Sequence, residues 1–153
     1  MGAEVSFAYQ NIENYEFEGD ALKLSINNRR ILTLLLAQHI IKNFEEGEKP
    51  KNTGALSHDL GIPIRLVNDL VFGLVEAGIL SEIVSDNPKD RRYQPAVDIN
   101  KITVGYVYNQ LEKVGGSNMH VTESEELEKI TRIYEHIMHS VKESPSNILL
   151  KDI

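Results

Sequence analysis

Apolar residues recur on a helical period between positions 27 and 44, with few of the alternations that are typical of a strand. The residues that carry this pattern are Ile31, Leu32, Leu34, Leu35, Ile40, Ile41 and Phe44. The pattern predicts a well-buried helix that ends before the turn-forming residues 46–50.

Two shorter helices are expected at close spacing. Thr53 can cap a helix over 54–60 because its hydroxyl accepts a backbone N–H, and Gly61 suits the left-handed residue that ends it. Pro63 favours a first helical turn, and the next helix runs to Gly78. Its buried stripe consists of Leu66, Val67, Leu70, Val71, Leu74 and Val75. This pair predicts a helix-turn-helix.

Two strands are expected next, over 79–85 and 91–97, joined by the turn-rich residues 86–90. Thr103 then caps a helix through Lys113. This order of elements predicts a mainly α fold with a small β-hairpin, namely a winged helix-turn-helix with an extra C-terminal helix.

The extra helix is expected over 123–144, after a linker at 115–122 that begins with two glycines. Thr122 and Glu125 match a capping box, and Pro145 follows the helix. The sequence therefore divides into an N-terminal segment (1–26), a winged-helix domain (27–114), the linker, the C-terminal helix and a tail (145–153).

The C-terminal helix carries an apolar stripe of about two heptads, which is too short for an isolated coiled coil. The stripe consists of Leu127, Ile130, Tyr134, Ile137 and Val141, and the first four are candidate partner contacts. It can fold back on the winged-helix core or pair with a second copy. Because acidic residues crowd the first turn, a parallel pair is disfavoured. We expect an antiparallel or intramolecular arrangement and favour a homodimer.

Charge is unevenly distributed over the 153 residues, whose net charge is −7. Residues 1–26 and 114–153 are acidic, whereas residues 27–113 contain 11 acidic and 11 basic side chains. This balance excludes a generic basic nucleic-acid binder. With no cysteine, the chain has no disulfide, thiolate nucleophile or cysteine-held metal cluster.

Residues 31–41 are the longest strongly apolar stretch, too short to cross a bilayer and interrupted by Gln38 and His39. The N-terminus lacks the basic and apolar regions of a secretory signal. We therefore expect a soluble piece.

Several segments resemble the C-terminal end of the YihY/BrkB family: residues 2–11 (GAEVSFAYQN), 15–18, 37–46 and 80–104. The resemblance covers roughly residues 2–114. In that family a transmembrane helix bundle precedes a cytoplasmic extension. The resemblance implies that residues 1–26 are juxtamembrane and that this chain is a fragment at the cytoplasmic face of the bacterial inner membrane. Its partner would be the membrane-embedded part of its own chain.

The family has long been labelled ribonuclease BN, which implies a tRNA-processing activity. Residues 82–103 also resemble small winged-helix repressors that sense redox or iron–sulfur state. Because this chain has no cysteine, cluster sensing is not expected.

No catalytic, metal-binding or cofactor-binding constellation is expected. His136 and His139 are spaced to share a helix face, but only Glu135 or Glu143 would complete a metal site. The remaining histidines, His39, His58 and His120, are expected in solvent-facing positions. No phosphate-binding loop or nucleophile elbow is present.

Two groups of residues are candidates for nucleic-acid binding. Arg65 and Asn68 lie on the exposed face of the second helix of the helix-turn-helix, where side chains can read bases. Lys89, Arg91 and Arg92 lie in the wing and are candidate phosphate contacts. Acidic residues at 69, 76, 86 and 90 lie beside both groups and oppose DNA binding.

Ile64 and Phe72 make the same helix face partly apolar, which favours contact with a protein or packing within the chain. The leading interpretation is therefore a non-enzymatic regulatory or protein-interaction module of a YihY/BrkB-like membrane protein. The alternatives are a DNA-binding winged-helix transcription regulator and a ribonuclease.

Overall fold

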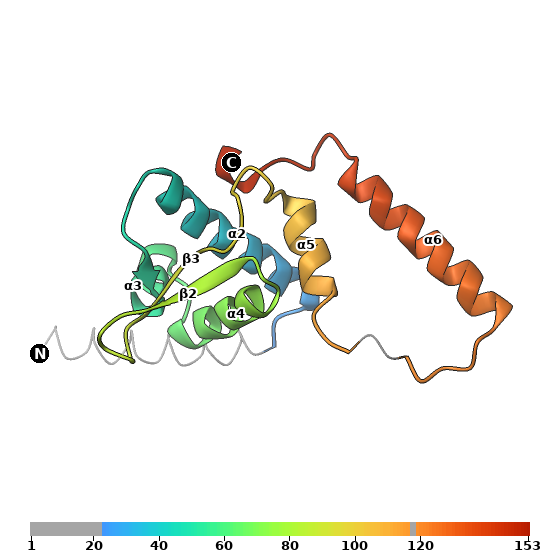
Figure 1. The fold of residues 1–153 in the computed structure, drawn as a ribbon, viewed down its shortest axis with the longest axis horizontal. Helices are drawn as coiled ribbons and strands as arrows, with labels where there is room; N and C mark the ends of the chain where they lie inside the picture. Colours follow the sequence, from blue (N-terminus) through green and yellow to red (C-terminus); the bar gives the residue numbers. More distant parts are fainter. Residues whose placement is uncertain (1–22, 117–118) are drawn as a thin grey trace, which may run out of the picture.

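The computed structural model describes residues 23–116 and 119–153 (Figure 1). Most of the expected juxtamembrane segment (1–26) lies outside this part of the chain. Helix α2 (Ile26–Glu45) begins where the Ser25 hydroxyl accepts the N–H of Asn28 at 3.1 Å. Its buried face consists of Thr33, Leu36, Ala37, Ile40 and Ile41. The predicted first helix is confirmed, but its predicted buried stripe is only partly right. Ile31, Leu35 and Phe44 are exposed, whereas Leu36 and Ala37 are completely buried.

Helices α3 (Thr53–Leu60) and α4 (Ile64–Glu76) form the predicted helix-turn-helix. Gly61 between them has a φ of 63°, which is the expected left-handed end of α3. The predicted cap is wrong by one residue. Asn52 is the N-cap and accepts the N–H of Ala55 at 2.9 Å, because Thr53 is already the first helical residue.

The wing consists of β2 (Leu80–Val84) and β3 (Arg91–Pro95), which are antiparallel. A third strand that the sequence did not predict, β1 (Lys51–Asn52), pairs with the other side of β3 and gives the order β1-β3-β2. Two residues are too few to show a hydrophobic alternation. This strand places the start of α3 directly beside the wing.

The core includes the C-terminal tail. Helix α5 (Val104–Glu112) has Thr103 as its cap, as predicted. Beyond α6, residue 149 bridges to Thr103, and the short 3-10 helix η1 (Leu150–Asp152) packs on α2. Leu150 is only 1% exposed. In Figure 1 the C-terminus accordingly lies beside α2 and α5, so the folded unit extends beyond residues 27–114.

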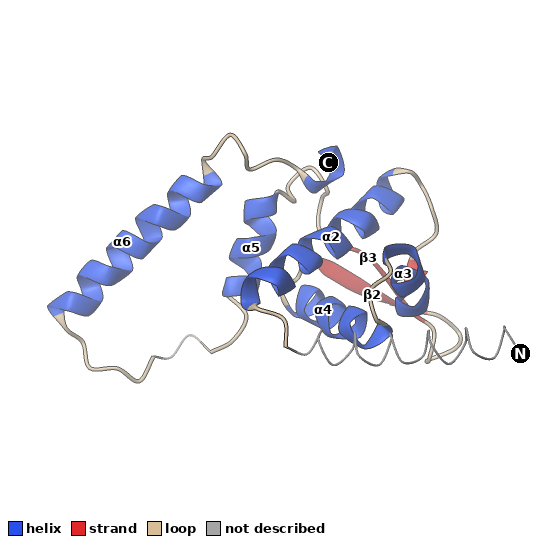
Figure 2. Ribbon diagram, turned by 180° about the vertical axis from the view of Figure 1, so that it is seen from behind, coloured by secondary structure: helices blue, strands red, loops and turns tan. Residues whose placement is uncertain are grey.

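Helix α6 (Glu125–Lys142) stands apart from the other elements in both ribbon views (Figures 1 and 2). Its cap is Ser124, not Thr122, because only Ser124 is close enough to accept the N–H of Leu127. It buries no residue and contacts mainly α5, so the fold-back over the core is not observed. Within the described ranges, no helix is both long and apolar enough to span a membrane.

Candidate nucleic-acid interface

A hydrogen bond across the turn and a buried apolar cluster fix α4 against α3, and they determine which face of α4 is exposed to solvent. The Ser57 hydroxyl donates to the carbonyl of Ile62 across the turn at 2.6 Å. Below the turn, a buried cluster joins α3 and α4, consisting of Leu56, Leu66, Val67, Leu70, Val71 and Leu74. The opposite face of α4 is consequently exposed along its length.

Arg65 and Asn68 are both on this exposed face, as predicted. Among the described residues, Arg65 has no carboxylate within ion-pair distance, so its guanidinium is available to a ligand. Asp69, which was expected to repel phosphates, lies 3.0 Å from the guanidinium of Arg29 on α2. This ion pair reduces the repulsion that the sequence predicts at the face.

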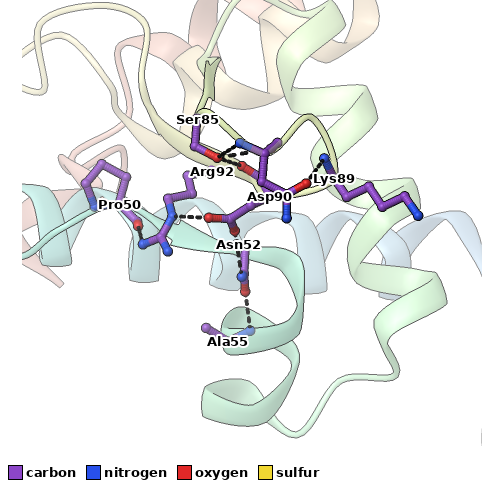
Figure 3. Close-up of polar contacts among 8 residues, drawn as sticks. Pro50, Asn52, Ala55, Ser85, Lys89, Asp90 and Arg92 are labelled. Atoms are coloured by element: carbon purple, nitrogen blue, oxygen red, sulfur yellow. Dashed lines mark hydrogen bonds and ion pairs between the residues drawn. The ribbon is translucent and has the colours of Figure 1, made fainter.

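The wing divides its basic residues between two sides, because side chains alternate along a strand. Arg91 lies on the side of β3 that faces α4, with its Nε 3.4 Å from the carboxylate of Glu82. Arg92 lies on the other side, next to β1. Lys89 has no carboxylate partner in the described part of the chain, and its side chain extends away from the polar contacts of the wing loop (Figure 3).

A depression of about 660 Å³ lies between α4, the wing and the N-terminus of α3. It brings together three of the five predicted nucleic-acid residues, Asn68, Lys89 and Arg91. The rest of its lining consists of Asn52, Thr53, Gly54, Phe72, Val75, Glu82 and Tyr93. Cationic side chains, an amide and a helix N-terminus thus surround one open site, and all three can bind phosphate or base edges.

Arg92 is not part of this depression and has two partners of its own. Its Nε donates to Asp90 at 3.1 Å and its Nη1 donates to the carbonyl of Pro50 at 3.1 Å (Figure 3). It lines a second, smaller depression of about 420 Å³ together with Glu48, Lys49 and Lys51. The role of Arg92 as a phosphate contact stays a prediction. In the structure, Arg92 connects the wing loop to the residue before β1.

Asp90 is the acceptor at the centre of these contacts. The amide of Asn52 and the guanidinium of Arg92 hydrogen-bond its two carboxylate oxygens and hold the pKa of Asp90 below its usual range. Sequence reasoning missed Asn52 and expected Asp90 to oppose DNA binding. The available signal was that Asn caps helices at least as well as Thr, which favours residue 52 over residue 53 as the cap.

The predicted partner contacts are exposed in the described part of the chain. Phe72 is 64% and Ile64 is 47% exposed, and α6 does not cover them. On α6, Ile130, Tyr134 and Ile137 are also exposed, and Leu127 is partly buried. Neither apolar surface is therefore covered by the part of the chain that the structure describes.

The histidines form no metal site among the described residues, where no group of three or more potential ligands is brought together. His39, expected in a solvent-facing position, lies partly buried with its Nε2 3.0 Å from Asp59. Asp59 also pairs with Lys51 at 2.7 Å, and Lys51 is the main reason that its pKa is lowered. This cluster ties α2, α3 and β1 together.

A scan of protein-family models and a search of curated proteins gave no match. Solved structures match most of the chain. CymR (YrzC), the global cysteine regulator of B. subtilis, has a TM-score of 0.55 and 22% identity, covering 84% of this chain and 95% of that one. The chain has the winged-helix fold.

Two further structures agree. IscR of T. potens gives a TM-score of 0.56 at 17% identity and covers 86% of this chain and 87% of its own. CymR of Staphylococcus aureus gives a TM-score of 0.50 at 18% identity, and the match covers 81% of this chain and 93% of that one. At these identities the likeness shows the fold, and function is argued from the site.

Proposed function

We propose that this chain binds double-stranded DNA as a winged-helix transcription regulator. The observation that carries the proposal is the shared depression of Asn68, Lys89 and Arg91 at the N-terminus of α3, with Arg65 one turn before Asn68 on α4. The similar structures support it, because CymR is described as a global cysteine regulator.

Each residue has a role that its chemistry suits. Arg65 and Asn68 project from the first half of α4, which is the part of a recognition helix that enters the major groove. Arginine pairs with guanine and asparagine with adenine through two hydrogen bonds each. Lys89 and Arg91 hold phosphates from the wing.

The acidic composition of the chain weakens the proposed DNA binding but does not exclude it. The part of the chain that carries the interface has a net charge of zero, and Asp69 is paired with Arg29. Few phosphates are therefore neutralised, and we expect an affinity that falls with salt less steeply than for a strongly basic protein.

The test is fluorescence anisotropy with duplexes selected from a random library. We expect binding at about 50 mM salt that weakens as salt is raised. Arg65→Ala should cost about 1–3 kcal/mol and relax sequence preference, whereas Lys89→Ala should weaken all duplexes alike and lower the salt slope by about 1. Lys129→Ala on α6 is the matched control. Absence of binding by the unmodified chain at low salt overturns the proposal.

A second copy of the chain is the proposed partner of α6. The exposed face of Ile130, Ile133, Tyr134 and Ile137 needs a cover. The first turn of α6 is acidic (Glu125, Glu126 and Glu128) and the last carries His139 and Lys142. An antiparallel pair places the acidic start of one helix beside the basic end of the other, which also suits two-fold symmetry. The dimer would then read two half-sites.

The resemblance of residues 2–11 to the YihY/BrkB family favours a second candidate. In it, this chain is the cytoplasmic module of a membrane protein and regulates it or contacts other proteins. A run of hydrophobic segments encoded immediately before Gly2, with the full-length protein in the membrane fraction, supports this candidate. Full-length protein in the soluble fraction rejects it.

A further inference from the structure

One side chain, the amide of Asn52, joins the helix-turn-helix to the wing. Its oxygen accepts the N–H of Ala55 at 2.9 Å and so caps α3. Its nitrogen donates to Asp90 Oδ1 at 3.0 Å. Both halves of the amide are therefore used, one on each element (Figure 3).

The second oxygen of Asp90 extends the connection. It accepts from Arg92 Nε at 3.1 Å, and Arg92 Nη1 in turn reaches the carbonyl of Pro50. The backbone follows the same path, since Asn52 is paired with Arg92 between β1 and β3. We call Asn52, Asp90 and Arg92 the wing latch.

The latch acts on the part of the wing that carries the cations. Lys89 precedes Asp90 and Arg91 follows it, and both line the depression beside α4. Strand β1 pairs with β3 only at Arg92 and Tyr93, so the loop end of the wing beyond this pairing is two-stranded. A two-stranded hairpin is marginally stable in water, and an additional attachment helps it to hold one orientation. The latch supplies such an attachment at the first residue after Lys89.

We propose that Asn52 and Asp90 are positioning residues, which fix the wing against the start of α3 so that Lys89 and Arg91 face the same DNA as Asn68. This inference rests on the proposed function. It assigns to Asp90 an effect opposite to the one that its charge predicts, because an acid near phosphates should weaken DNA binding.

The first test compares Asp90→Asn with Asp86→Asn. Each substitution removes one negative charge from the wing loop, and among the described residues the Asp86 side chain makes no hydrogen bond or ion pair. Charge alone predicts tighter DNA binding for both. The latch predicts that Asp86→Asn binds slightly more tightly and Asp90→Asn binds about tenfold more weakly. Asn52 and Arg92 donate to different oxygens of Asp90, and the substitution replaces one of these oxygens with an NH2 group that cannot accept, so one of the two hydrogen bonds is lost.

The second test breaks the latch from the other side and then repairs it. Asn52→Asp keeps an N-cap, because aspartate also caps helices, but it puts two carboxylates against each other. The double variant Asn52→Asp with Asp90→Asn restores a carboxylate–amide pair and the original net charge. We expect Asn52→Asp to weaken DNA binding and the double variant to recover most of the loss.

The third measurement is made without DNA, so that the latch and the proposed function can fail separately. The N–H of Asp90 donates to the carbonyl of Asn87 at 2.9 Å and reports on the wing loop through hydrogen exchange. We expect faster exchange in Asp90→Asn and Asn52→Asp, normal exchange in Asp86→Asn, and partial recovery in the double variant.

The outcomes separate the two ideas. Unchanged exchange in Asp90→Asn, or DNA binding by Asp90→Asn as tight as by Asp86→Asn, overturns the latch and leaves the proposed function standing. If Asp90→Asn exchanges faster but the unmodified chain does not bind DNA, the latch holds the wing in place without serving DNA binding. This result overturns the proposed function and, with it, the positioning role.

Discussion

Helices α4 and α6 carry the same kind of amphipathic pattern, but only the stripe of α4 is covered. Five residues of the 13-residue α4 are buried, whereas the 18-residue α6 buries none. The α4 stripe meets α2, α3 and the sheet, while α6 meets mainly α5. Periodicity therefore identifies the face that needs a cover, and the neighbouring elements decide whether the chain itself provides it.

The largest contrast should appear when one apolar residue is truncated in each helix. Leu74 is completely buried, so Leu74→Ala removes contacts and leaves a cavity, at a cost of about 2–5 kcal/mol. Ile133 is 61% exposed, and Ile133→Ala should change the unfolding free energy of the winged-helix core by less than about 0.5 kcal/mol. Urea denaturation followed by circular dichroism measures both. Equal losses would mean that α6 belongs to the cooperative core.

A charge on the α6 face should act on association instead of folding. Replacing Ile130 and Ile137 with Asp should weaken a dimer at least about a hundredfold, or about 3 kcal/mol, because four carboxylates would enter an apolar contact. Sedimentation velocity measures this shift, and the core should keep its urea midpoint. An unmodified chain that stays monomeric at high concentration contradicts the dimer.

The tail should behave like the core, although it follows α6 in the sequence. Leu150 is buried beside α2, and its N–H donates to the carbonyl of Ile102 at 3.0 Å. We expect Leu150→Ala to cost about 2 kcal/mol, at the low end for a buried leucine because a chain end can relax around the cavity. Ile153→Ala, at an exposed position, is the control for the urea experiment.

Most of the fold could be predicted from the sequence, because local signals and the hydrophobic period agree in α2 to α5. Gly61 and Thr103 were predicted correctly from their backbone and capping preferences. The caps Asn52 and Ser124 were missed because several neighbouring residues can cap, and only the backbone decides which one does. Strand β1 and the docked tail depend on contacts distant in sequence, which no local pattern encodes.

The sequence predicts which residues belong to the candidate site, but it does not predict how they are arranged in space. Strand alternation separates Arg91 from Arg92, yet the sequence does not say which side faces α4. The pairing of Asp69 with Arg29 joins positions 40 residues apart. The latch between Asn52 and Asp90 joins positions 38 apart. A paired acid presents less negative charge to the site than an unpaired one, so counting charges along the chain overstates the repulsion at the α4 face.

The smallest expected effect comes from the ion pairs of acidic residues, which differ between the winged-helix core and α6. In the core, Asp59 of α3 pairs with Lys51 of β1 and His39 of α2, whereas the pairs within α6, such as Glu125 with Lys129, are local and exposed. The hydrogen bond from Lys51, followed by that from His39, lowers the pKa of Asp59 below its ordinary 3.8. A lowered carboxyl pKa stabilises the folded state above 3.8, and this contribution is lost as the pH falls through the folded-state value.

We therefore expect Asp59→Asn to lower the unfolding free energy at neutral pH by up to about 1 kcal/mol, the upper range for a partly exposed pair. The difference from the unmodified chain should disappear as the pH falls below the lowered pKa of Asp59, because both chains then carry a neutral group at residue 59. Glu125→Gln on α6 should leave the core midpoint unchanged at every pH. Urea midpoints measured across the acid range check both expectations, and a difference for Asp59→Asn that persists at the acid end would show that shape, not charge, makes residue 59 important.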